Sequence, residues 1–209
     1  MFVGHLSLAF AGKTISRDTP LAWLMAAACL VDLLWPLFLL AGAEHVRIAP
    51  GMTAFTPLDF YDYPITHSLV GGLVWAVLLA VAARGTYRHW RAALPLAGGV
   101  LSHWVLDVIS HRPDVPVLPG GPYLGLGLWN SVAATLVVEL ALFGGGVYLY
   151  TRGRRPPLSF WLLIAVLLIA YLGAAFGPPP PDVTTLAVSA LAVWVFVAWA
   201  WWADRTPLR

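Results

Sequence analysis

The stretch Leu158–Phe176 reads LSFWLLIAVLLIAYLGAAF and contains no charged residue. About 20 apolar residues, each adding 1.5 Å of helix rise, cross a hydrocarbon core of roughly 30 Å, so this stretch predicts a membrane-spanning helix. The whole chain contains six apolar segments of this kind, at 20–42, 66–83, 92–110, 128–150, 158–176 and 183–203. We therefore expect an all-α fold, a polytopic transmembrane helical bundle.

The composition supports a membrane protein and excludes other classes. Hydrophobic residues make up 60% of the chain and charged residues 11%, whereas soluble domains carry about 25% charged residues. The net charge is only +2 and no basic stretch is interleaved with aromatics, which excludes a nucleic-acid partner and leaves membrane lipids as the expected partners. Cys29 is the only cysteine, so there is no disulfide framework. We expect a single integral membrane domain over residues 1–209, and the sequence indicates no oligomeric state.

A shorter apolar stretch, 1–12, precedes the first spanning segment. It is too brief to cross a bilayer, so we expect a short helix that lies in the interface or re-enters the bundle. No internal repeat is visible, and an inverted-repeat transporter is therefore not supported.

The positions of lysine and arginine predict the orientation. If the N-terminus is cytoplasmic, only Arg47 and Arg112 face outward, and all other basic residues fall on the cytoplasmic side. These cytoplasmic residues are Lys13, Arg17, Arg84, Arg88, Arg91, Arg152, Arg154, Arg155, Arg205 and Arg209. We expect both termini in the cytoplasm. The long outward connection 43–65, which contains Glu44, is then placed to act as a lid or a binding surface.

The segment 92–110 carries the clearest chemical pattern, in the run Ser-His-Trp-Val-Leu-Asp-Val-Ile-Ser-His. His103, Asp107 and His111 are spaced by four residues and so fall within an arc of about 80° on one helix face. An imidazole and a carboxylate one turn apart suit two ligands of one divalent metal. His103 and His111 are about 12 Å apart along a regular helix, so either two metals are bound or His111 contacts a metal ligand and not the metal itself. Asp114 follows Pro113 and can turn back toward the same face.

A packing role is the alternative for these residues. One intramembrane histidine is often only hydrogen-bonded to a neighbouring helix, but several ionisable groups on one face are expensive, at roughly 2.5–3.5 kcal/mol for each charge near the bilayer centre. That cost favours a functional cluster over packing.

Three further residues are expected near the same site. His67 lies in Thr66-His67-Ser68 at the start of the segment 66–83, where capping, an interfacial location and ligation all remain open. Asp32 lies at mid-depth if the segment 20–42 is one regular helix, and a buried carboxylate needs a cation or hydrogen-bond donors. His5 can approach Asp32 if the stretch 1–12 dips into the bundle. These groups gather toward the extracytoplasmic side.

In order and spacing, four pieces of the first 120 or so residues resemble the bacterial membrane-bound metal-dependent hydrolases, also described as LexA-binding inner-membrane hydrolases. The pieces are Gly4-His5, Asp32 with Pro36, Thr66-His67-Ser68, and Ser102-His103 with Asp107. The resemblance implies a bacterial inner-membrane location and metal-dependent hydrolysis, without naming a substrate. Two positions depart from the family. Its pattern Pro-Asp-x-Asp-His-Pro is reduced here to Asp32 and Pro36, and Asp62 stands where a histidine is common.

These observations lead to a functional hypothesis with two alternatives. We expect a divalent metal, zinc before manganese or iron, with His67, His103 and Asp107 as ligands and His5 and His111 as further ligands. Asp32 or Asp114 is expected to act as general base. Access from within the bilayer suggests a lipid or lipid-linked ester as substrate. The alternatives are a transporter or permease that uses the same groups for ion or proton coupling, and a non-catalytic membrane scaffold.

Overall fold

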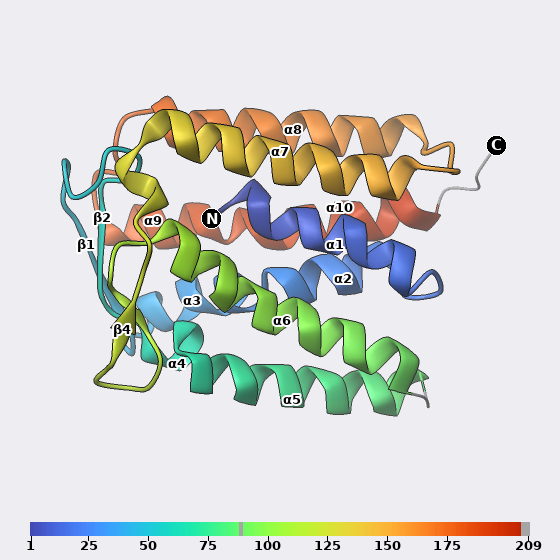
Figure 1. Cartoon of the computed structure of the whole chain (residues 1–209), viewed down its shortest axis with the longest axis horizontal. Helices are drawn as coiled ribbons and strands as arrows, with labels where there is room; N and C mark the ends of the chain where they lie inside the picture. Colours follow the sequence, from blue (N-terminus) through green and yellow to red (C-terminus); the bar gives the residue numbers. More distant parts are fainter. Residues whose placement is uncertain (88–89, 206–209) are drawn as a thin grey trace.

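The computed structural model describes residues 1–87 and 90–205, and it is an all-α bundle whose long helices lie side by side (Figure 1). Helices long and apolar enough to cross a membrane include α5 (Leu69–Tyr87), α6 (Trp90–Ser110), α7 (Val132–Thr151), α8 (Leu158–Phe176) and the nearly continuous pair α9 (Val183–Ala190) and α10 (Ala192–Arg205). The predicted helical bundle is confirmed. Arg88 and Arg209, which were counted in the orientation, lie outside the described residues.

The segment 20–42 is not the regular helix that we expected. It forms α2 (Leu21–Ala28) and α3 (Leu30–Leu40), which meet at Cys29 with a bend of 57°. Helix α6 packs closely against this bend, because a Cβ at Gly99 would lie 3.1 Å from Ala27 Cβ. The break places Asp32 in the first turn of α3, where the positive end of the helix dipole stabilises a carboxylate.

The N-terminal stretch forms α1 (Val3–Ile15), which lies within the bundle and not in the interface. Two contacts with α7 hold it there. Glu139 Oε2 accepts hydrogen bonds from the backbone N–H groups of Phe2 at 2.8 Å and Gly4 at 3.1 Å, and so satisfies donors at the start of α1. Further along, a Cβ at Gly146 would lie 2.4 Å from the Ser7 carbonyl oxygen, so the two backbones approach at a glycine.

The end of the bundle that carries the strands is here called the hairpin end (Figure 1). There β1 (His45–Ile48) pairs antiparallel with β2 (Leu58–Asp62), followed by the short helix α4 (Pro64–His67). A second small sheet joins β3 (Val115–Pro116) to β4 (Tyr123–Leu124), and the 3-10 turn η1 (Leu128–Asn130) precedes α7. The long connection 43–65 is thus largely an ordered hairpin over the bundle end.

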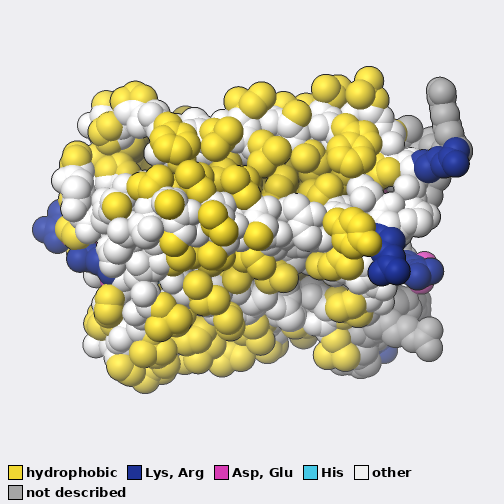
Figure 2. Space-filling view, turned by 45° about the horizontal axis from the view of Figure 1, so that its top comes forward, with side chains coloured by type: hydrophobic (Ala, Val, Ile, Leu, Met, Phe, Trp, Pro, Cys, Tyr) yellow, Lys and Arg dark blue, Asp and Glu magenta, His cyan; other side chains and the backbone are white. Residues whose placement is uncertain are grey.

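The surface matches a protein that sits in a bilayer. In Figure 2 hydrophobic side chains cover the length of the visible face, and lysine and arginine side chains appear at its two ends. Exposed apolar residues such as Val77, Val137 and Ile169 lie on the outer faces of the long helices. The buried histidines His5, His67, His103 and His111, by contrast, lie inside the bundle toward the hairpin end, together with Asp107.

Candidate metal centre

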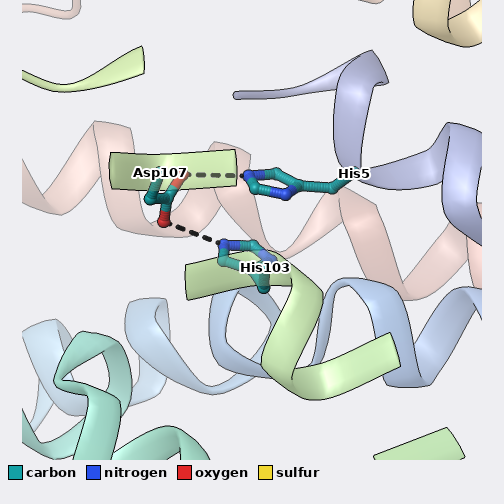
Figure 3. A group of neighbouring side chains, drawn as sticks. All are labelled: His5, His103 and Asp107. Atoms are coloured by element: carbon teal, nitrogen blue, oxygen red, sulfur yellow. Dashed lines mark hydrogen bonds and ion pairs between the residues drawn. The ribbon is translucent and has the colours of Figure 1, made fainter. Parts of the chain in front are cut away.

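The candidate site is centred on Asp107, a carboxylate of α6 that is only 2% exposed. Four imidazole Nε2 atoms surround its two oxygens. His5 lies 3.1 Å from Oδ1, His111 lies 3.8 Å from Oδ1, His103 lies 3.3 Å from Oδ2, and His67 lies 4.0 Å from Oδ2. Figure 3 shows two of these rings, His5 and His103, pointing toward the same carboxylate. Elements far apart in the chain therefore meet at one point.

Asp32 completes the group from the first turn of α3. Its Oδ1 lies 3.4 Å from His67 Nε2, and its Oδ2 lies 3.6 Å from His103 Nε2. The Asp32 side chain is 30% exposed, whereas that of Asp107 is 3% exposed. Asp32 is therefore the carboxylate of the group that solvent or a ligand can reach.

The second ring nitrogen of His103 is held by the bend in the helix before it. His103 Nδ1 lies 2.8 Å from the carbonyl oxygen of Ala28, the last residue of α2. Only a protonated Nδ1 can donate to a carbonyl, so a proton lies there, and in the neutral ring Nε2 carries the lone pair. His103 Nε2 is buried and has no hydrogen-bond partner among the described residues.

His67 is held through two side chains. Its Nδ1 lies 2.6 Å from Thr66 Oγ1, and the Thr66 hydroxyl donates to Glu44 Oε2 at 2.7 Å. Because the threonine proton is committed to Glu44, the threonine oxygen accepts from His67 Nδ1–H. The Nε2 lone pair of His67 then faces Asp32 and Asp107. A histidine held by an outer carboxylate in this way is typical of metal sites.

His111 is held by Asp114, whose Oδ1 lies 3.0 Å from His111 Nδ1. Arg112 donates to the other oxygen of Asp114 at 3.0 Å, and Tyr63 donates its hydroxyl to Oδ1 at 3.4 Å. Burial lowers the pKa of His111, because the desolvation penalty on the charged ring outweighs the nearby carboxylates. His111 therefore stays neutral, the form that binds metals, and Asp114 lies behind it, away from the centre.

These donors fit a divalent ion. Two groups of three, namely His5 with His103 and Asp107, and Asp32 with His67 and His103, each offer ligand atoms within 4.8 Å of one another. A mixture of neutral imidazole nitrogens and carboxylate oxygens suits zinc, manganese or iron. Four histidines turn Nε2 toward the same buried carboxylate, and the Nδ1 contacts of His67, His103 and His111 leave Nε2 as the nitrogen that can bind an ion.

A cavity of about 430 Å³ adjoins the centre, with Asp32, His67, Asp107 and His111 in its wall. Most of its other lining residues are apolar and come from the N-terminus, α3, the hairpin, η1 and α8 to α10. They include Trp35, Phe60, Trp129, Ala170, Val193 and Phe196. Ala174, Ser189 and Ala192 also line the cavity and are exposed, so it opens sideways between α8 and the α9–α10 pair.

Sequence reasoning missed several residues that shape this site. It found nothing specific in the last two spanning segments, yet α8, α9 and α10 form one side of the cavity. It noted Glu44 only as part of an acidic loop. The Ala28 carbonyl is a main-chain group, so the residue type at position 28 gives no sign of its role. The one available clue was the sequence Glu-His-Val-Arg-Ile, whose alternation of polar and apolar residues is typical of a strand edge beside Glu44.

Comparison of the chain with protein-family models, with curated proteins and with solved structures finds no match. The case for a metal centre therefore rests on the geometry of the residues themselves.

Proposed function

We propose that the chain is a divalent-metal hydrolase of the bacterial inner membrane that acts on a lipid or a lipid-linked ester. One observation carries the proposal. The free Nε2 atoms of His67 and His103 and the reachable carboxylate of Asp32 converge at the inner end of an apolar cavity that opens toward the bilayer.

In this proposal His67, His103 and Asp107 hold the ion, and zinc is the best match for two nitrogens and an oxygen. A divalent ion in such a site acts as a Lewis acid that lowers the pKa of water to about 7 and polarises the scissile bond. The protein's contribution is to present the lone pairs. The Ala28 carbonyl and the Thr66–Glu44 pair fix both imidazoles before any ligand arrives.

Asp32 is the residue that we assign as general base. It borders the cavity, its oxygens are near both histidine nitrogens, and the first turn of α3 favours its ionised form. Asp114, the other candidate from the sequence, is a poorer base because both of its oxygens already bind His111 or Arg112. We assign Asp114 to the positioning of His111.

The cavity supports an apolar substrate. Aromatic and aliphatic walls exclude water from the reacting group and offer favourable burial for an acyl or prenyl chain, at about 25 cal/mol for each Å² of apolar surface. The opening between α8 and α9–α10 lets such a chain enter from the membrane. By the distribution of basic residues, the hairpin end and the metal centre face the extracytoplasmic side.

Metal analysis of the purified protein is the first test. Protein purified in mild detergent without added metal is expected to retain at least one divalent ion per chain, and His103→Ala and Asp107→Ala are expected to release it. The control is His45→Ala, since the exposed His45 pairs with Asp62 in the hairpin and is not one of the histidines around Asp107. Wild-type protein that is free of metal, and that does not take it up on titration, would contradict the proposal.

The second test is turnover. The metal-loaded protein in detergent micelles is presented with lipid carboxylic esters and lipid phosphate esters, and product is followed by mass spectrometry. Product that disappears in Asp32→Asn, with metal content retained, supports the assignment. Ion or proton flux in liposomes without any hydrolysed product would support the transporter instead.

A further inference from the structure

We propose that the centre holds two divalent ions and that the Asp107 carboxylate bridges them. The inference rests on the proposed metal function and extends it from one ion to a pair. It starts from the observation that the two oxygens of Asp107 face different donors.

The donors divide into two matched sets. On the Oδ2 side lie the Nε2 atoms of His103 and His67, at 3.3 and 4.0 Å. On the Oδ1 side lie the Nε2 atoms of His5 and His111, at 3.1 and 3.8 Å. Each set therefore offers two imidazole nitrogens and one carboxylate oxygen, a combination that binds divalent ions and leaves positions open for other ligands.

The stacking of His5 on His103 explains why one ion is not enough. Their ring centroids are 3.5 Å apart and the ring planes differ by only 6°. An imidazole binds a metal in the plane of its ring, along the Nε2 lone pair, and these two planes run side by side toward Asp107 (Figure 3). By distance alone the Nε2 atoms of His5 and His103 are close enough to share one ion, but a single ion could not lie in both ring planes. Two ions can, because paired metal sites have separations of about 3.5–4 Å, close to the ring spacing.

A positive charge already lies on the Oδ1 side. The amino nitrogen of Met1 is 2.9 Å from Asp107 Oδ1 and 3.3 Å from Ser110 Oγ. A buried carboxylate is stable only when it is paired, so the position beside Oδ1 attracts a cation. The Met1 ammonium group and a second metal ion would compete for the same position beside Asp107 Oδ1. The number of ions bound per chain shows which of the two occupies it.

The experiment counts ions and tests whether they are neighbours. The full chain in detergent is stripped with a chelator, reloaded with Mn²⁺ and dialysed. The metal content is then measured, and an electron paramagnetic resonance spectrum is recorded. We expect two Mn²⁺ per chain and the multiline spectrum of a coupled pair. His5→Ala and, separately, His111→Ala are expected to lower the content to one ion and to give the six-line spectrum of isolated Mn²⁺.

Each other outcome has a definite meaning. One ion per wild-type chain with a six-line spectrum would overturn the bridged pair and leave the proposed hydrolase intact, with the ammonium group of Met1 on the Oδ1 side. No bound ion would overturn both. Two ions without magnetic coupling would place the second ion elsewhere and also overturn the bridge. His45→Ala is the control for surface binding and must leave the count unchanged, and the wild-type result stands even if a variant fails to fold.

Discussion

The hydroxyl oxygen of Thr66 lies 2.6 Å from Nδ1 of His67, its neighbour in the chain. The same hydroxyl donates to Glu44, which also accepts from the Thr66 backbone N–H at 2.8 Å. Glu44, at the base of the hairpin, therefore fixes both the backbone and the hydroxyl proton of Thr66, the residue that holds the candidate ligand His67. This relationship leads to the first of four predictions.

Replacing the Thr66 hydroxyl is expected to weaken metal binding. Thr66→Val keeps the side-chain shape but leaves Glu44 and His67 Nδ1 without their shared partner, so metal affinity should fall about 10–100-fold, as it does when outer partners of ligands are lost. The dissociation constant is measured by competition with a chromophoric chelator. Thr66→Ser is the control, because it retains the hydroxyl and should bind nearly as well as wild type. Equal affinity in the valine variant would show that the Thr66 hydroxyl does not position His67 for metal binding.

A methyl group at Gly99 is expected to disturb His103. The added Cβ would lie 3.1 Å from Ala27 Cβ and 3.4 Å from Ala28 N, which pushes α6 away from the bend that supplies the Ala28 carbonyl. Gly99→Ala should therefore lower metal affinity by about tenfold or more, the lower end of the range for lost outer partners. Gly98→Ala is the matched control, since nothing lies within 4 Å of its Cβ. If the two variants bind metal alike, close packing at Gly99 does not position the histidine.

The run Gly144-Gly145-Gly146 in α7 offers a test of how α1 is seated. A Cβ at Gly146 would lie 2.4 Å from the Ser7 carbonyl oxygen, whereas nothing lies within 4 Å of a Cβ at Gly145. Gly146→Ala should destabilise the bundle by about 1–3 kcal/mol through overpacking. Gly145→Ala should be neutral or stabilising, because alanine favours a helix by up to about 1 kcal/mol over glycine. Thermal unfolding in detergent, followed by circular dichroism, distinguishes the two results.

Narrowing the side opening is expected to slow turnover of long-chain substrates. Ala192 lines the cavity and is exposed, so Ala192→Trp places an indole in the opening. Turnover should fall by about tenfold, equivalent to about 1.4 kcal/mol of activation free energy, while metal content stays unchanged. Ala198→Trp is the control, because Ala198 is exposed on the same helix but does not line the cavity. A loss of activity that is equal in both variants would argue against access through this opening.

The spanning helices were predictable because apolar runs of membrane length have few other structural uses. The spacing of His103 and Asp107 also placed them correctly on one face of α6, since a regular helix has a fixed period. The segment boundaries differ from the structure by a few residues. The short helix α4 precedes α5, and Ser131 caps the start of α7 after a 3-10 turn.

Other parts of the site could not be predicted. The break at Cys29 follows a run of three alanines, which are strong helix formers, so nothing local indicates a bend. The contribution of α8 and α10 to the cavity wall could not be predicted for a different reason. Residues that line an apolar cavity, such as Phe196, are of the same types as residues that face lipid, so the sequence does not distinguish them. Similarly, the length of the stretch 1–12 left open whether it lies in the interface or enters the bundle, because the backbone contact at Gly146 and the cap from Glu139 that decide this are tertiary features.

The bend between α2 and α3 has a consequence for the tolerance of this protein to mutation. The acceptor that orients His103 is the main-chain carbonyl of Ala28, and every amino acid has that group. No single replacement at position 28 can delete it. A substitution can affect this hydrogen bond only by altering the path of the backbone or the neighbours packed against it, so its loss would never appear as the loss of a side-chain group at position 28.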